Sequence, residues 1–165
     1  MSELKHLSKE AIPAALQKAE RYRLLNEPGE AESICLDILA TDPDNQPAII
    51  ILLLALTDRF SKGYGVSETQ ANHLLAQIEG DYERAYYAGI LAERRAKAKL
   101  AQGHPGAGHY AYHELCEAMR QFEIAEKIRP HGNDDALLRW NTCARMITKN
   151  KLAAREDDRS EPVLE

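Results

Sequence analysis

The run AIIILLLAL, from Ala48 to Leu56, constrains the fold more than any other stretch of the chain. Its nine residues are fewer than half of the roughly 20 that a bilayer-spanning helix needs, so the run predicts a buried segment of a soluble protein. It follows the pair Asp42-Pro43, which ends a helical pattern because the residue before proline is pushed out of the helical conformation. A helix that is apolar on nearly every side needs neighbours on several sides. The run therefore predicts a helix sandwiched between helical hairpins.

Elsewhere apolar residues recur three and four positions apart and do not alternate, which predicts an all-α chain of about seven helices without strands. Turn residues divide these helices. Ser8 is expected to cap the first helix, and Ser67 with Gln70 has the pattern of a capping box at the start of the fourth. The expected helices cover residues 8–25, 30–40, 46–60, 67–79, 81–102, 109–129 and 133–152.

A chain of 165 residues suits one compact domain. We expect this helical domain to cover residues 1–152, followed by an acidic, flexible tail over residues 153–165. The net charge of -5 argues against binding to a nucleic-acid backbone, which needs clustered Lys and Arg. The three cysteines form no CxxC pair, and the N-terminus lacks the apolar core of a secretory signal, so a cytoplasmic location is expected.

Residues 12–45 carry small, aromatic and proline residues at fixed places of a 34-residue helix-turn-helix unit. Ala19 is eighth, Tyr22 eleventh, Ala31 twentieth and Pro43 thirty-second. Near the other end, Ala118, Phe122, Ala125 and Pro130 keep the spacing of the second helix of such a unit. The chain resembles the tetratricopeptide-repeat (TPR) family on these residues, across roughly positions 12–150. Insertions at 61–66 and 103–108 leave the regularity of the repeat open.

The resemblance implies antiparallel helical hairpins stacked as a short TPR-like α-solenoid, with about three hairpins and a closing helix. It also implies a non-enzymatic module that binds a protein or peptide partner in a concave groove. Carrying over the groove positions of the family gives Leu16, Glu20, Arg23 and Leu24 in the first unit, Ile50, Leu54, Thr57 and Asp58 in the second, and Leu137, Asn141, Ala144 and Arg145 in the closing helix, with Glu93 and Arg94 as candidates for the third unit.

In such a groove we expect Arg23 and Arg145 to pair with carboxylates of the partner, while the aliphatic side chains supply most of the binding energy. Each of these residues also fits an ordinary solvated surface. A homo-oligomeric scaffold, such as a homodimer formed through the apolar second hairpin and the closing helix, is an alternative function.

Gly89 lies in a stripe with Ala85, Ala92 and Ala96 on one side of the expected fifth helix. A glycine inside a helix costs about 1 kcal/mol relative to alanine, so something must offset that cost. Close packing of a neighbouring helix is the favoured interpretation, and a ligand-admitting groove is the other.

A possible metal site is formed by His109, His113 and Cys116, which lie at helical spacing on one side of the expected sixth helix, with His104 nearby. The same stripe continues through charged residues, which is typical of an exposed polar face, so we expect no metal and no cofactor. The SKGYGV segment lacks the spacing of a phosphate-binding loop, although Tyr64 is placed to contact a partner. No catalytic constellation is recognisable.

Overall fold

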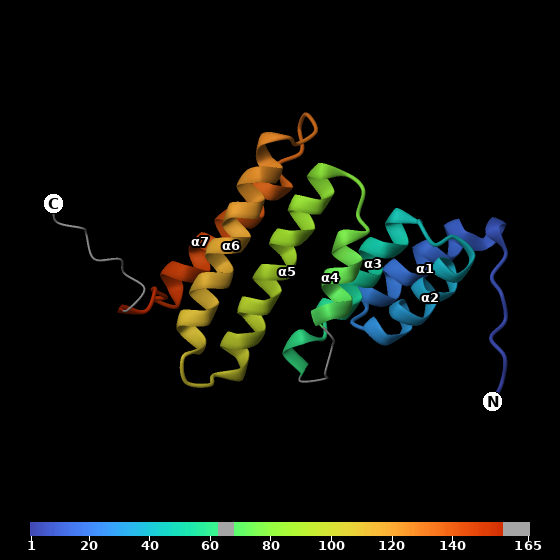
Figure 1. Ribbon diagram of the computed structural model, residues 1–165, viewed down its shortest axis with the longest axis horizontal. Helices are drawn as coiled ribbons and strands as arrows, with labels where there is room; N and C mark the ends of the chain where they lie inside the picture. The colour runs from blue at the N-terminus through green and yellow to red at the C-terminus, as the bar shows by residue number, and fades with distance from the viewer. Residues whose placement is uncertain (63–67, 157–165) are drawn as a thin grey trace. The chain divides into compact units, whose positions relative to one another are not determined.

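The computed structural model describes residues 1–62 and 68–156 (Figure 1). Within these ranges the chain forms seven α-helices, two short 3-10 helices and no strand, which confirms the predicted all-α class. The capping box expected at Ser67 and the partner contact expected at Tyr64 lie outside the described residues. The α-helices are α1 (Ile12–Leu24), α2 (Pro28–Thr41), α3 (Gln46–Thr57), α4 (Glu68–Ala76), α5 (Asp81–Gln102), α6 (Ala107–Lys127) and α7 (Asp135–Lys149).

The chain divides into two compact units, Met1–Gly80 and Asp81–Glu165. The first contains α1 to α4 and the second α5 to α7. The boundary falls between Gly80 and Asp81, inside the span that the sequence analysis treats as one domain. Whether the two units act as one repeat domain stays a prediction. None of the described helices has both the length and the apolarity that crossing a bilayer requires.

In the first unit, α1 and α2 pack against each other, and α3 contacts α1, α2 and α4. Ile12, Ile38 and Ala48 form a buried cluster that joins the first three helices. Most of the apolar run is buried, including Leu52 and Leu53. Since fully burying a Leu or Ile side chain contributes about 1.5–3 kcal/mol, the run is a main source of this unit's stability.

The start of α3 is fixed by side chains in the turn after Pro43. The Asn45 side-chain oxygen accepts a hydrogen bond from the backbone N–H of Ala48 at 3.0 Å, so Asn45 caps the helix. Gln46 donates to the carbonyl of Gln77 at 3.2 Å and accepts from the N–H of Glu79 at 3.0 Å. These bonds tie the start of α3 to the segment that follows α4.

In the second unit, α5, α6 and α7 lie side by side and alternate in direction (Figure 1). Gly89 of α5 faces the ring of Phe122 on α6, so the packing interpretation of this glycine is confirmed. The side-chain oxygen of Asn133 accepts from the N–H of Asp135 at 3.0 Å in the turn that leads into α7, whose N-cap residue Asp134 makes no side-chain capping bond.

Several helix ends differ from the expectation. The chain enters the first helix through a 3-10 turn, Lys9–Ala11, and Ser8 makes no side-chain capping bond, so the predicted Ser8 cap is wrong. The third helix ends at Thr57 because a separate 3-10 turn, Phe60–Lys62, follows it. The sixth begins at Ala107, directly after Gly106, whose backbone is left-handed with φ of 82°.

Candidate partner-binding groove

An open hollow lies along α1 in the first unit. It has a volume of about 500 Å³ and is lined by Leu16, Gln17, Glu20, Arg21 and Leu24 of α1, with Ile51 of α3. We call this the α1 groove. The five α1 residues recur three and four apart, so they share one side of the helix. Ile51 is 8% exposed and contributes an apolar surface from the neighbouring helix.

The chemistry of the α1 groove is mainly apolar with a few charges. Leu24 is 72% exposed, which leaves its side chain available to a partner. Leu16 and Glu20 are half-buried. Three of the four groove residues predicted for the first unit, Leu16, Glu20 and Leu24, therefore line one hollow.

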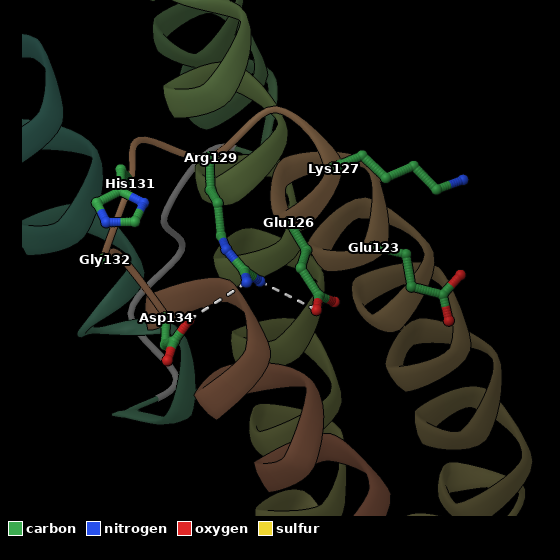
Figure 2. A pocket seen from close by; sticks show the side chains of 7 residues that line it. All are labelled: Glu123, Glu126, Lys127, Arg129, His131, Gly132 and Asp134. Carbon is green, nitrogen blue, oxygen red and sulfur yellow. Dashed lines mark hydrogen bonds and ion pairs between the residues drawn. The ribbon is translucent and has the colours of Figure 1, made fainter.

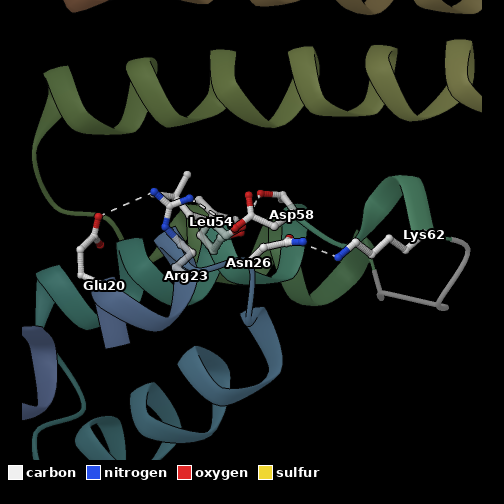
Figure 3. A network of polar contacts seen from close by, with 8 residues as sticks. Glu20, Arg23, Asn26, Leu54, Asp58 and Lys62 are labelled. Carbon is white, nitrogen blue, oxygen red and sulfur yellow. Dashed lines mark hydrogen bonds and ion pairs between the residues drawn. The ribbon is translucent and has the colours of Figure 1, made fainter. Parts of the chain in front are cut away.

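The fourth predicted residue, Arg23, is engaged within the molecule. Its guanidinium donates to a carboxylate oxygen of Asp58 at 3.3 Å and lies 3.7 Å from the carboxylate of Glu20 (Figure 3). The side chains of Arg23 and Asp58 are only 17% and 23% exposed, so this pair is partly shielded from water. The expected pairing of Arg23 with a partner's carboxylate is not favoured, because two carboxylates of the chain already occupy it.

The pair belongs to a set of contacts that fixes the first hairpin to the end of α3. Lys62 donates to the Asn26 side-chain oxygen at 3.3 Å (Figure 3). Arg59 forms an ion pair with Glu32. These contacts join residues more than 25 positions apart in sequence. They hold the α1 and α3 sides of the groove in one arrangement.

The groove residues predicted at α3 and its C-cap differ in how far they are buried. Thr57 is 4% exposed, and its hydroxyl donates to the carbonyl oxygens of Leu53 and Leu54 at 2.9 and 3.1 Å. Such a hydroxyl has no surface to offer to a partner. Ile50 and Leu54 are half-buried, as is Asp58.

The groove residues predicted on α5 and α7, in the compact unit that begins at Asp81, also differ in exposure. Glu93 is fully buried, forms a hydrogen-bonded ion pair with Arg139 of α7, and lies 3.3 Å from the ammonium of Lys97. Its carboxylate therefore points into the unit. Arg94 is half-buried on α5. On α7, Arg145 is exposed, while Leu137, Asn141 and Ala144 are half-buried.

The His/Cys stripe on α6 is not assembled as a metal site. His109 is hydrogen-bonded through Nδ1 to the carbonyl of Ala153 at 2.9 Å, and the ring of His113 meets the edge of Tyr112. Cys116 contacts the hydroxyl of Tyr112, and this contact raises the pKa of Tyr112. Over residues 1–62 and 68–156, no three or more His, Cys, Asp or Glu side chains are grouped so that they could hold a metal ion.

A larger hollow at the turn between α6 and α7 has no counterpart in the sequence predictions. Its volume is about 890 Å³, and its lining is polar and of mixed charge (Figure 2). Arg129 spans it, lying 3.1 Å from the carboxylate of Glu126 and 3.6 Å from that of Asp134. The carboxylates of Glu126 and Asp134 neutralise the guanidinium of Arg129, so this side chain does not give the hollow a net positive charge that would attract an anionic ligand.

Two features of the α1 groove were not predicted from the sequence, namely Ile51 as a lining residue and the pairing of Arg23 with Asp58. Opposite charges at the twelfth place of the first expected unit and the thirteenth place of the second were a usable signal for that pair. No family model, curated protein or solved structure matches this chain.

Proposed function

We propose that the chain is a TPR-like interaction module that holds an apolar segment of a partner protein or peptide in the α1 groove. The proposal rests on one observation. Repeat positions chosen from the sequence alone, at Leu16, Glu20 and Leu24, line a single open hollow beside Ile51. Stacking of α1–α2 on α3–α4 as successive repeat units is part of this proposal, and the contacts of α3 with both α1 and α2 support it.

The residues that line the α1 groove favour one kind of partner. Two leucines and an isoleucine favour aliphatic side chains, and the open shape suits a peptide segment better than an enclosed small molecule. Glu20 and Arg21 lie among the lining residues with opposite charges, so the groove does not select a strongly charged peptide. The proposal assigns no catalytic role to any residue.

The test uses a peptide selected from a phage-displayed random library against the whole protein, with affinity measured by fluorescence anisotropy. The variant Leu24→Glu should weaken binding by about tenfold to a hundredfold, since losing the burial of one leucine costs about 1.5–3 kcal/mol. Leu24 is exposed, so the fold should be preserved, which circular dichroism checks.

Leu36→Glu is the matched control. Leu36 is 48% exposed on α2 and does not line the groove, so this variant should bind the peptide as the unchanged protein does. Equal binding by the Leu24 variant and the unchanged protein would overturn the proposal. Arg23→Glu is a poor test because it would place a third carboxylate beside Asp58 and Glu20.

A further inference from the structure

Arg21 is a charged residue that lines the α1 groove, and its side chain is exposed. Across residues 1–62 and 68–156, its guanidinium forms no ion pair and no hydrogen bond. It lies on the same side of α1 as Leu24, three residues further on, which is also exposed. The positive charge of Arg21 is therefore available to a segment that fills the apolar hollow.

The other charged residue of the groove lining, Glu20, is already engaged within the chain. Its carboxylate lies 3.7 Å from the guanidinium of Arg23, which also pairs with Asp58 at 3.3 Å. Both carboxylates are turned toward Arg23 (Figure 3). The free charge of the lining is therefore that of Arg21, and the contact with a partner's carboxylate that the sequence predicts for Arg23 is open to Arg21 instead.

Gln17 adds a second available polar group to the same edge of the groove. It lies one helical turn before Arg21 on the same side of α1, and it is exposed. In the part of the chain that the structure describes, its side-chain amide has no hydrogen-bond partner. Such an amide can donate to and accept from the main chain of a bound segment. Gln17 and Arg21 thus form a polar edge along the apolar hollow.

We propose that Arg21 sets the specificity of the α1 groove by pairing with a side-chain carboxylate, an Asp or a Glu, that lies beside the aliphatic residues of the bound segment. This inference rests on the proposed function, because it concerns the same groove. Leu16, Leu24 and Ile51 supply the apolar contact, while the exposed ion pair adds little affinity and mainly selects among apolar segments. A segment with Lys or Arg at that place meets a like charge and is disfavoured.

Selection from the random peptide library gives the first measurement. Peptides that bind the unchanged protein should carry an Asp or a Glu at a fixed distance from their aliphatic residues. Peptides selected on the Arg21→Glu variant should carry Lys or Arg at that place. One peptide from the first selection is then synthesised with an amidated C-terminus, so that its only carboxylates belong to side chains, and its affinity is measured by fluorescence anisotropy.

Arg21→Glu should weaken the binding of this peptide by about tenfold, because an attraction between exposed charges is replaced by a repulsion. A second peptide, in which Lys replaces the acidic residue, should bind Arg21→Glu about as tightly as the first peptide binds the unchanged protein. Lys18→Glu is the matched control. It makes the same charge change at an exposed position of α1 outside the groove, so it should alter the affinity by less than about twofold.

Leu24→Glu separates this inference from the proposed function. If Leu24→Glu weakens binding while Arg21→Glu does not, the groove holds the peptide but Arg21 does not select it, and the inference alone is overturned. Selected peptides with no preferred acidic residue would overturn it in the same way. If neither variant weakens binding, or if the library yields no binding peptide, both the proposed function and this inference are wrong.

Discussion

Gly89 gives a physical reason for a residue that is otherwise unfavourable inside a helix. A Cβ atom built at this position would stand 2.5 Å from Cε1 of Phe122, closer than real carbon contacts allow. Phe122 is fully buried, so its ring has little room to move away. The glycine therefore admits an aromatic ring to the α5–α6 contact.

Gly89→Ala should lower the free energy of unfolding by about 1–3 kcal/mol, the usual cost of overpacking a core. Helix propensity alone predicts the opposite, a gain of about 1 kcal/mol. Urea unfolding followed by circular dichroism decides between the two effects.

Gly29→Ala is the control for this substitution. A Cβ at Gly29, in the first turn of α2, meets no atom within 4 Å, so propensity should dominate and the variant should be as stable as the unchanged protein or more so. If both variants are more stable than the unchanged protein, the contact between position 89 and Phe122 has room for a Cβ atom, which would contradict the prediction.

Two of the three cysteines, Cys35 and Cys143, are buried and have raised thiol pKa values. Burial, with a smaller effect of Glu20, raises the pKa of Cys35 from 9.0 to about 12. Burial, with a smaller effect of Glu93, raises the pKa of Cys143 from 9.0 to about 12. Because thiolate is the reactive form and only about one part in ten thousand of each thiol is ionised at pH 8, both thiols should react slowly.

Ellman's reagent at pH 8 should therefore titrate close to one thiol in the folded protein, that of the half-buried Cys116, and three in urea. Since the folded chain keeps protons that the unfolded chain releases, the stability contributed by these two thiols is present below pH 9 and is lost as the pH rises toward 12. Rapid reaction of all three thiols in the folded protein would show that Cys35 and Cys143 are not buried as described.

Among the elements, α5 and α7 are joined by a buried ion pair. Glu93 is fully buried, while Arg139 and Lys97, with side chains 31% and 43% exposed, approach its carboxylate from the surface. Removing one partner of such a pair leaves a charge in the interior, which costs far more than losing an exposed pair.

Arg139→Leu should accordingly lower the free energy of unfolding by about 2 kcal/mol, since Lys97 still neutralises Glu93 in part. The double variant Glu93→Leu, Arg139→Leu should recover most of this loss, because no unpaired charge remains. Arg120→Leu, which removes the exposed pair with Glu117, should leave the urea midpoint unchanged. Equal effects of Arg139→Leu and Arg120→Leu would show that the Glu93 pair is not buried as described.

The elements also show what the sequence could predict. The bounds of α5 were predicted correctly because Asp81 and the left-handed Gly103 mark its two ends. The start of α1 was predicted wrongly, since no sequence pattern separates a 3-10 turn from the first turn of an α-helix. The burial of Glu93 had a signal, because it lies four residues after Gly89 in the packed stripe, but its partner Arg139 is 46 positions away.

At the scale of the whole molecule, the two compact units contain different features. The first unit contains the α1 groove, and the second contains the Glu93 pair and the Gly89 contact. Repeat spacing predicted the α1 side of the groove because a groove position depends on local helix register. The opposite charges of Arg23 and Asp58 were a signal for their pairing, but repeat spacing alone did not predict it, since the pairing depends on how α1 docks on the end of α3.

The most direct test of the account is to map the selected peptide on the full ¹⁵N-labelled protein by two-dimensional NMR. Amide shifts should concentrate on α1 between Leu16 and Leu24 and at Ile51 of α3, where the groove lies. They should be lost in Leu24→Glu and retained in Leu36→Glu. Shifts confined to other helices, with α1 unaffected, would contradict the assignment of the α1 groove as the binding surface.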